Sequence, residues 1–276
     1  MTDEALPHPV TGALFPSPVP PGTGWPGDPA DADTPVARTT RQAARLANSS
    51  ATREEVDARS SVCRACPRLV RWREQVATTG KRASFAAEPY WGRPGPSFGD
   101  PDAEVLVMGL APAANGANRT GRMFTGDKSG DWLFAALHRA GYANQDHAWA
   151  AGDGLVLTGI RIVAAVRCAP PDNKPTTTER DTCSAWLDRD LQLCAPKLRS
   201  ILCLGSFGWD AVLASARRLG WSVPRPKPKF GHGAEAAVVT DQGHGIRLLG
   251  TYHPSQHNTF TGRLTTDMFD AVLARL

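Results

Sequence analysis

Short apolar runs alternate along the chain with longer segments that are apolar on one side only. Buried strands are expected where four or five apolar residues follow one another, as in Glu104–Met108 and Ser200–Leu204. Helices are expected where apolar residues recur every three or four positions, as in Gly130–Ala140 and Thr178–Leu193. This alternation of strands and helices predicts an α/β fold.

The same two patterns predict the remaining elements. Further strands are expected within Leu155–Val166, Ala236–Thr240 and Ile246–Tyr252, the last two joined by the turn "DQGHG". Further helices are expected in residues 38–60, as one or two helices, and in Cys66–Val76, Gly208–Arg218 and Phe269–Leu276. A mostly parallel sheet covered on both faces by helices accommodates all of these elements.

Each main strand runs into a loop rich in glycine, proline and polar residues. The four loops are "GLAPAANGANRTGRMFTGD" from Gly109, "RCAPPDNKP" from Arg167, "GSFG" from Gly205 and "HPSQHN" from His253. Ligands of open α/β sheets bind beyond the carboxyl ends of the strands, so we expect the four loops to line one cleft. Surface loops are commonly rich in glycine and proline, and composition alone does not require a cleft.

The first 35 residues differ from the rest of the chain in composition. Nine of the 23 prolines fall there, among glycine, aspartate, alanine and threonine. Such a segment has few large apolar groups to offset the entropy lost on ordering. We interpret residues 1–35 as a tail, extended or draped over a single domain that spans residues 36–276.

Charge and hydropathy narrow the choice of partners. The start of the chain, "MTDEALPHPV", has acidic residues and no apolar run, so it is not typical of a secretory signal. No stretch approaches the roughly 20 apolar residues that span a bilayer, which predicts a soluble, cytoplasmic protein without a membrane partner. The net charge of +4 permits a nucleic-acid partner without requiring one.

Six cysteines divide into two groups. Cys203 lies inside an apolar strand and Cys194 at a helix end, positions typical of small buried residues. The other four are Cys63, Cys66, Cys168 and Cys183. Because cytoplasmic proteins rarely contain disulfides, four spaced thiols suggest a metal. An all-cysteine iron–sulfur cluster tolerates the wide second spacing better than zinc does; a cluster, a zinc ion and free thiols all remain open on spacing alone.

Three stretches taken together resemble the family 5, or type B, uracil-DNA glycosylases. They are "GLAPAANGANRTGRMFTGD" (109–127), "VRCAPPDNKP" (166–175) and "HPSQHNTFTGRLT" (253–265). The resemblance covers about residues 60–276 and leaves residues 1–35 outside. It implies the uracil-DNA glycosylase fold, a three-layer α/β/α sandwich with a central, mostly parallel four-stranded sheet.

The resemblance also implies an activity and a cofactor. It implies a monofunctional DNA glycosylase that flips uracil out of double- or single-stranded DNA, hydrolyses its glycosidic bond and so initiates base excision repair. It implies a structural 4Fe–4S cluster on Cys63, Cys66, Cys168 and Cys183. We expect a monomer that acts at the nucleoid. The alternatives are a damaged-DNA-binding protein of the same fold without turnover, and an unrelated iron–sulfur oxidoreductase. The latter is disfavoured because no G-x-G-x-x-G follows a strand.

The resemblance assigns the base pocket to four residues. Phe124 would stack on the base, and Asn173 would offer uracil's edge a donor and an acceptor. Gly109 and Ala111 would complete the pocket. Other branches of the superfamily carry Asp, Glu or Asn at the position of Ala111, so a roomier pocket is expected, one that also accepts hypoxanthine and ethenocytosine. Ordinary core packing of Phe124 and an ordinary turn at Asn173 are the alternatives.

Catalysis is assigned to two residues. His253, fixed by Pro254, would donate a hydrogen bond to the departing uracil anion. Asp127 would stabilise the sugar cation and orient water, although it could instead cap a helix that begins near Ser129. Asn115 is a second candidate for holding water.

Contacts to DNA phosphates are expected around the same motifs. The predicted contacts are Arg119, Arg122, Ser255 and Arg263. Lys128 and Lys174 are assigned to phosphates as well, because nothing in the sequence positions either of them as a Schiff-base nucleophile.

Overall fold

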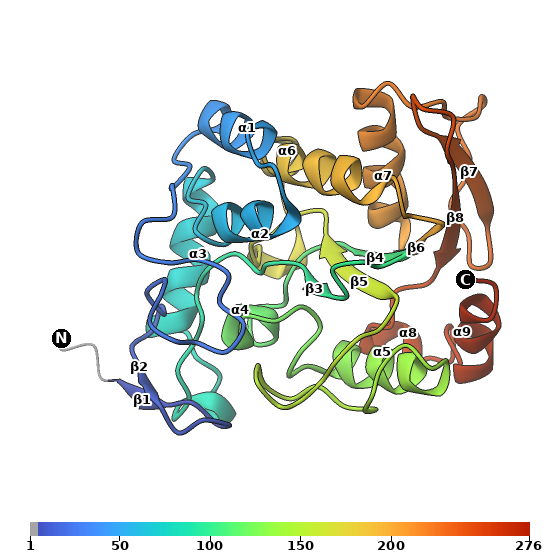
Figure 1. The fold of residues 1–276 in the computed structure, drawn as a ribbon. Helices are drawn as coiled ribbons and strands as arrows, with labels where there is room; N and C mark the ends of the chain where they lie inside the picture. Colours follow the sequence, from blue (N-terminus) through green and yellow to red (C-terminus); the bar gives the residue numbers. More distant parts are fainter. Residues whose placement is uncertain (1–4) are drawn as a thin grey trace.

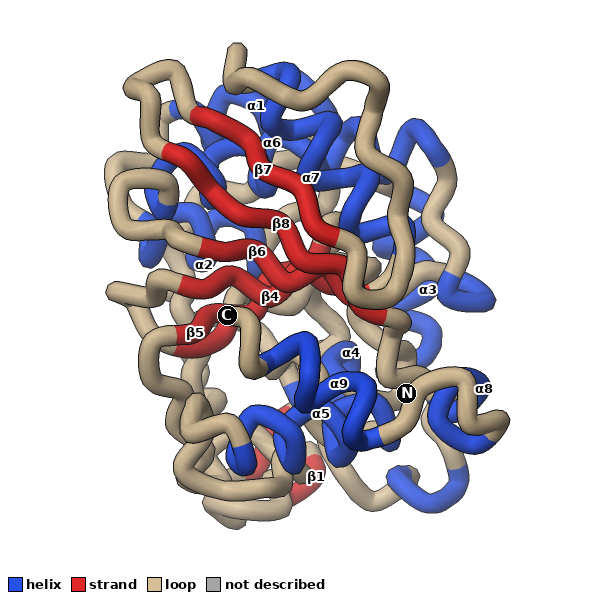
Figure 2. Tube along the Cα trace, turned by 90° about the vertical axis from the view of Figure 1, so that its right-hand side faces the viewer, coloured by secondary structure: helices blue, strands red, loops and turns tan. Residues whose placement is uncertain are grey.

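The computed structural model describes residues 5–276, so the first four residues of the expected tail lie outside the described part. A central sheet is covered by helices on both faces (Figure 1). Its strands are β3 (Phe98–Gly99), β4 (Val105–Gly109), β5 (Ile160–Ala164), β6 (Ser200–Leu204), β7 (Glu235–Val239) and β8 (Gly245–Thr251). They lie in the order β3-β5-β4-β6-β8-β7, and Figure 2 shows the five neighbouring strands from β5 to β7.

The four inner strands are parallel, as predicted. Val107 of β4 pairs with Ile162 of β5 on one side and with Leu202 of β6 on the other, and β8 continues the parallel set. The two edge strands are antiparallel: β3 pairs with β5, and β7 forms the predicted hairpin with β8. The sheet is therefore mixed and six-stranded around a parallel centre. At two residues, β3 is too short to leave a pattern in the sequence.

The helices form the two outer layers. They are α1 (Thr40–Asn48), α2 (Arg53–Ser61), α3 (Pro67–Thr78), α4 (Ala117–Thr120), α5 (Lys128–Arg139), α6 (Thr177–Cys194), α7 (Ser206–Arg218), α8 (Gln256–Phe260) and α9 (Thr266–Leu273), with short 3₁₀ turns η1 (Ala83–Phe85) and η2 (Pro171–Asn173). Figure 1 places α6 and α7 on one face of the sheet and α5 and α9 on the other. Within residues 5–276, none of the helices has the length and apolar character needed to cross a membrane.

Alternate residues of each strand supply the two halves of the core. Val105 and Val107 pack with buried residues of α5 and α9, whereas Leu106 and Met108 pack with buried residues of α6 and α7. Successive strand side chains point to opposite faces, so one apolar run serves both layers. This packing is the predicted three-layer sandwich.

Helix boundaries differ from the prediction where capping residues decide them. α5 begins at Lys128 rather than Gly130 because Asp127 caps it, and α9 begins at Thr266 rather than Phe269 because Thr265 accepts a hydrogen bond from the Met268 amide. The prediction did not include α4 and α8, which have only four and five residues.

The N-terminal segment packs closely against the domain. It contains a small hairpin of β1 (Leu6–Pro7) and β2 (Leu14–Phe15). Trp25 is buried, packs near Trp91 and donates an indole hydrogen bond to the Thr120 carbonyl at 3.1 Å. Asp28 forms a buried bidentate ion pair with Arg93 at 2.8 and 2.9 Å. Residues 5–35 therefore support the loop that follows β4.

Candidate active site

A cavity of about 270 Å³ opens at the carboxyl ends of β4, β5 and β8; we call it the inner cavity. Its lining includes seven of the predicted site residues: Gly109, Ala111, Phe124, Asp127, Asn173, His253 and Ser255. Three of the four expected loops thus converge. The expectation for the fourth loop was wrong: among the described lining residues none follows β6, because α7 begins at Ser206 directly after Gly205 and leads the chain away.

Phe124 forms one wall of the inner cavity. Its φ of 54° lies in the left-handed region, which residues other than glycine rarely adopt. The ring lies against Gly109, where an added Cβ would come within 3.2 Å of it. Phe124 also packs on the core beneath, so its packing and its exposure to the cavity coexist. Strained backbone beside a cavity is typical of ligand sites.

His253 lies two residues beyond the end of β8 and forms an adjoining wall. The Asn258 side-chain amide donates to the His253 carbonyl at 2.9 Å, which fixes the backbone together with the ring of Pro254. In the described part of the chain no hydrogen bond holds the imidazole. Desolvation lowers the pKa of His253 to about 4, so the ring is neutral near neutral pH and has one N–H to donate.

Asp127 caps α5, one of the two roles that the sequence left open, and also lines the inner cavity. One carboxylate oxygen accepts a hydrogen bond from the Gly130 amide at 2.9 Å and caps α5. The other lies beside Gly116, where an added Cβ would collide with it, and the residue lines the inner cavity. Burial raises the pKa of Asp127 above its usual value, which makes its carboxylate a better proton acceptor.

Asn173 ends η2 and reaches the cavity from the loop after β5. It has a φ of 55°, and the preceding Asp172 has a φ of 54°. Asparagine tolerates the left-handed region better than most residues. The same residue therefore forms the turn and places its side-chain amide in the cavity. No hydrogen bond to a described residue occupies this amide, which leaves it available to a ligand.

A larger cavity of about 620 Å³ adjoins the inner one; we call it the outer cavity. The two share Ala113, Asp127 and Asn173. Asn115 lines the outer cavity, and its side-chain oxygen accepts a hydrogen bond from the Tyr90 hydroxyl at 2.9 Å. The structure therefore separates Asn115 from the inner cavity and occupies the oxygen that would hold a water.

Two arginines predicted to contact phosphates lie inside the protein. Arg119 is 5% exposed and pairs with Glu88, and Arg122 is 8% exposed and pairs with Asp153 at 2.7 Å. Phosphate contact by Arg122 would break a buried ion pair, which is costly, whereas Arg119 and Glu88 both line the outer cavity. The structure instead gives both residues a part in holding the loop after β4.

The other predicted DNA contacts lie nearer the surface. Ser255 lines the inner cavity and precedes α8. Arg263 lies over the ring of Tyr252, 4.6 Å from its centroid. Lys128 lines the outer cavity and pairs with Asp131 at 3.1 Å. All three remain compatible with contact to a nucleic acid.

Several cavity residues were missed by the sequence patterns. Ser129 lines the inner cavity, and Pro9, Phe85 and Trp149 line the outer one. Pro9, Phe85 and Trp149 come from segments far apart in the sequence. Trp149 stands in an irregular loop, so no periodicity marks it, and only the fold brings it next to Asp127.

The four cysteines assigned to a cluster line one small pocket. Cys63 and Cys66 precede α3, Cys168 follows β5, and Cys183 belongs to α6. Within residues 5–276 no group of three or more His, Cys, Asp or Glu side chains is arranged to hold a single metal ion. In an iron–sulfur cluster each thiolate binds its own iron, so the four sulfurs need not converge on one point.

The buried positive charge of Arg73 indicates that the site of these four thiols suits an anionic group. Its side chain is 1% exposed, donates to the Cys168 sulfur at 2.8 Å and to the Cys63 carbonyl at 3.1 Å, and leaves its Nε without a partner. No carboxylate pairs with it among the described residues. Burial raises the pKa of the Cys66 thiol to about 12, so uncoordinated thiols would leave this cation uncompensated. Four metal-bound thiolates would compensate it.

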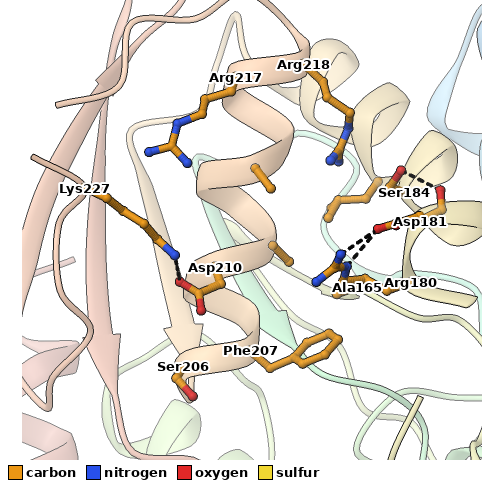
Figure 3. Close-up of a pocket in the computed structure, with 13 residues that line it drawn as sticks. Ala165, Arg180, Asp181, Ser184, Ser206, Phe207, Asp210, Arg217, Arg218 and Lys227 are labelled. Atoms are coloured by element: carbon orange, nitrogen blue, oxygen red, sulfur yellow. Dashed lines mark hydrogen bonds and ion pairs between the residues drawn. The ribbon is translucent and has the colours of Figure 1, made fainter. Parts of the chain in front are cut away.

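A further cavity, of about 340 Å³, lies between α6 and α7 (Figure 3). Its cations are largely matched: Arg180 pairs with Asp181 at 2.8 Å, and Lys227 pairs with Asp210 at 2.6 Å. Its lining includes none of the residues predicted for catalysis or base binding. The residues predicted for catalysis and base binding lie instead around the inner and outer cavities.

Comparison with known proteins identifies the family of the chain. The sequence model of the uracil DNA glycosylase superfamily matches residues 96–276. A type-5 uracil-DNA glycosylase of Mycobacterium tuberculosis is 56% identical over 265 residues, which cover 96% of each chain. The corresponding protein of Thermus thermophilus is 46% identical over 213 residues, 77% of this chain and 91% of that protein.

More distant similarity extends to another type. A type-4 uracil-DNA glycosylase of Archaeoglobus fulgidus is 26% identical over 161 residues, 58% of this chain. The mycobacterial match also corrects the expected extent of the resemblance. Since it covers 96% of this chain, residues 1–35 cannot lie wholly outside it.

Proposed function

This chain belongs to the uracil DNA glycosylase superfamily and, within it, to the type-5 uracil-DNA glycosylases, and from this premise we propose that it removes uracil from DNA by hydrolysing the bond between the base and deoxyribose. One observation carries the proposal beyond family membership. The inner cavity gathers Phe124, Asn173, His253 and Asp127 from three loops. A ring, an amide, a neutral imidazole and a carboxylate are the groups that this hydrolysis needs.

Binding of the base uses the first two groups. A uracil flipped out of the DNA would stack on the ring of Phe124. The free amide of Asn173 would donate to one position of the uracil edge and accept from the next. Both residues are held in left-handed backbone conformations, so little rearrangement is needed on binding.

Bond breaking uses the other two. As the bond from C1′ to the base breaks, the electron pair leaves with uracil and the sugar becomes cationic. The neutral imidazole of His253 donates a hydrogen bond to the anionic uracil oxygen without transferring its proton. The Asp127 carboxylate stabilises the sugar cation and takes the proton of the water that adds to C1′.

A direct assay tests this activity. Purified protein is incubated with duplex and single-stranded oligonucleotides that contain one uracil, and the abasic product is revealed by alkaline strand cleavage. We expect cleavage with uracil and none with thymine at the same position. His257→Ala, an exposed histidine on α8 outside the inner cavity, is the matched control for His253→Ala.

The same assay distinguishes the proposed glycosylase from the alternative, a damaged-DNA-binding protein without turnover. Such a protein would shift uracil-containing DNA in a gel and release no base at any enzyme concentration. A lysine nucleophile would reveal itself by a protein–DNA adduct trapped with borohydride. Lys128 pairs with Asp131, and no adduct is expected.

A wider substrate range is part of the proposal. Ala111 contributes only a methyl group to the inner cavity, and no carboxylate stands at its position. We expect hypoxanthine and ethenocytosine to be removed as well as uracil. The free space of about 270 Å³, which shares three lining residues with the outer cavity, supports the entry of bases larger than uracil.

A structural 4Fe–4S cluster is also part of the proposal. Cys63, Cys66, Cys168 and Cys183 would hold it, and the buried cation of Arg73 supports an anionic group there. The cluster would fasten the segment before α3 to the loop after β5, and that loop carries Asn173. Its contribution would be to position this loop, with no part in bond breaking.

Contact with DNA would extend beyond the cavities. Phe260, at the end of α8, is 77% exposed and lies one turn after Gln256 of the outer cavity. An apolar side chain there suits the gap that a flipped base leaves in the stack.

We expect a cytoplasmic location, with action at the nucleoid, because the proposed substrate is DNA. The monomeric state stays a prediction.

A further inference from the structure

The outer cavity has an aromatic side chain that the proposed chemistry does not use. Trp149 is 48% exposed, although large aromatic residues are usually buried. It lines the outer cavity together with Phe85, whose ring lies over the Arg119 guanidinium at 3.9 Å. Two aromatic side chains therefore flank an open space of about 620 Å³.

The backbone of Trp149 is held firmly. The buried carboxylate of Asp153 accepts the Trp149 amide at 3.0 Å and pairs with Arg122 at 2.7 Å. The Gly126 amide donates to the Ala148 carbonyl at 2.8 Å. The loop that carries Trp149 is thus tied to the loop that carries Asp127, and the Trp149 backbone is held beside the candidate active site.

The position of this space relative to the inner cavity limits what it can bind. The two cavities share Ala113, Asp127 and Asn173. A nucleotide whose base fills the inner cavity remains covalently joined to its neighbours in the strand. The neighbouring nucleotides must therefore lie close to the inner cavity, and the shared lining residues place the outer cavity within that region. Arg82 lines the outer cavity without an ion-pair partner among the described residues, so a cation is available for a phosphate.

We infer that the outer cavity is a subsite for the nucleotide adjacent to the flipped one, with its base stacked on Trp149. Aromatic faces stack on any base, and this contact contributes binding without strong sequence preference. The inference rests on the proposed function, because it needs a DNA strand whose target base occupies the inner cavity. It gives Arg122 and Asp153 the role of positioning this platform.

The test uses single-stranded oligonucleotides with one uracil and with either a normal base or a base-free tetrahydrofuran residue at each neighbouring position. For the wild-type protein, removal of the neighbouring base on one side should raise KM about tenfold, with kcat unchanged. Trp149→Ala should raise KM for the complete strand by a similar factor and should no longer respond to the missing base. Trp149→Phe should stay near the wild type.

Val156→Ala is the matched control, since Val156 is 57% exposed and does not line the outer cavity. The subsite is wrong if the wild-type KM is the same with and without either neighbouring base, a result that needs no variant. It is also wrong if Trp149→Ala keeps the full response to the neighbouring base. Absence of uracil release by the wild type from every oligonucleotide would instead overturn the proposed function.

Discussion

The rings of Phe124 and His253 lie with their centroids 5.8 Å apart and their planes tilted by 30°. A base sandwiched between two rings needs a contact distance of about 3.5 Å on each face, or about 7 Å in all. The observed separation is smaller. A base stacked on Phe124 must therefore present its edge to His253, which is where the uracil oxygens are.

Replacement of His253 by alanine should lower kcat by about 10²–10³ with little change in KM, because its hydrogen bond forms with charge that develops only during bond breaking. Single-turnover kinetics on a uracil oligonucleotide measure this directly. His257→Ala should behave as the wild type. An equal loss in both variants would remove His253 from the mechanism.

Protonation of His253 should also affect stability. The folded protein holds its pKa at about 4, against 6.5 for an ordinary histidine. Between these two values the unfolded chain binds a proton that the folded protein does not, so stability falls as pH falls through this window. The loss is at most about 3 kcal/mol.

Urea unfolding near neutral pH and near pH 4 measures this loss. His253→Gln lacks the group, so its free energy of unfolding should fall less than that of the wild type across the window. Other groups titrate in both proteins and cancel in the comparison. Identical pH dependence in the two proteins would contradict a buried neutral imidazole.

Asp127 should yield different results for two substitutions. Asp127→Asn keeps an oxygen that accepts the Gly130 amide but removes the charge, so stability should stay near the wild type while kcat falls. Asp127→Ala also removes the cap and should cost a further 0.5–2 kcal/mol or so of stability, typically about 1 kcal/mol. Thermal unfolding and excision rates together separate the two roles. Full activity in Asp127→Asn would leave capping as its only role.

Ala111 should set the substrate range. Ala111→Asp fills part of the inner cavity and adds a charge, so release of hypoxanthine and ethenocytosine should fall at least about tenfold relative to uracil. Competition assays with mixed oligonucleotides measure the ratio, with Ala111→Gly as the control that keeps the space. A wild-type protein that releases uracil and no larger base would contradict the broad range.

Local sequence patterns were sufficient for most of the fold. The strand Ser200–Leu204 was predicted to the residue because its apolar run is continuous, begins after Ser200 and ends before Gly205. The pattern of strands placed the loops that carry Phe124 and His253 at one edge of the sheet, whereas the roles of these two residues came from the resemblance to a known family. These features depend on neighbours in the sequence.

Long-range packing explains most of what could not be predicted. Composition suggested too few apolar groups in residues 1–35 for ordered packing, yet Trp25 is buried against Trp91 from a distant segment. The sequence predicted Arg119 and Arg122 as surface cations. In the structure they pair with Glu88 and Asp153 respectively, and each of these carboxylates lies about 30 residues away in sequence. Neither pairing leaves a local signal.

The proposed cluster makes a prediction that does not depend on activity. Protein purified without oxygen should contain iron and sulfide and absorb visible light, and Cys168→Ser should lose all three signals. Cys194→Ala, a buried thiol outside the pocket, is the control. Zinc in place of iron, or neither metal, would contradict the cluster.

Arg73 tests the charge argument behind this assignment. Arg73→Met keeps all four thiols and much of the side-chain volume but removes a buried cation, so the thiolates of Cys63 and Cys168 would lose a neighbouring positive charge. Iron retained per chain during dialysis against a chelator should fall well below that of the wild type. Arg139→Met, which removes a surface cation paired with Asp270 far from the pocket, should retain iron normally. Equal retention in both variants would mean that Arg73 does not stabilise an anionic group, and its buried charge would then need another partner.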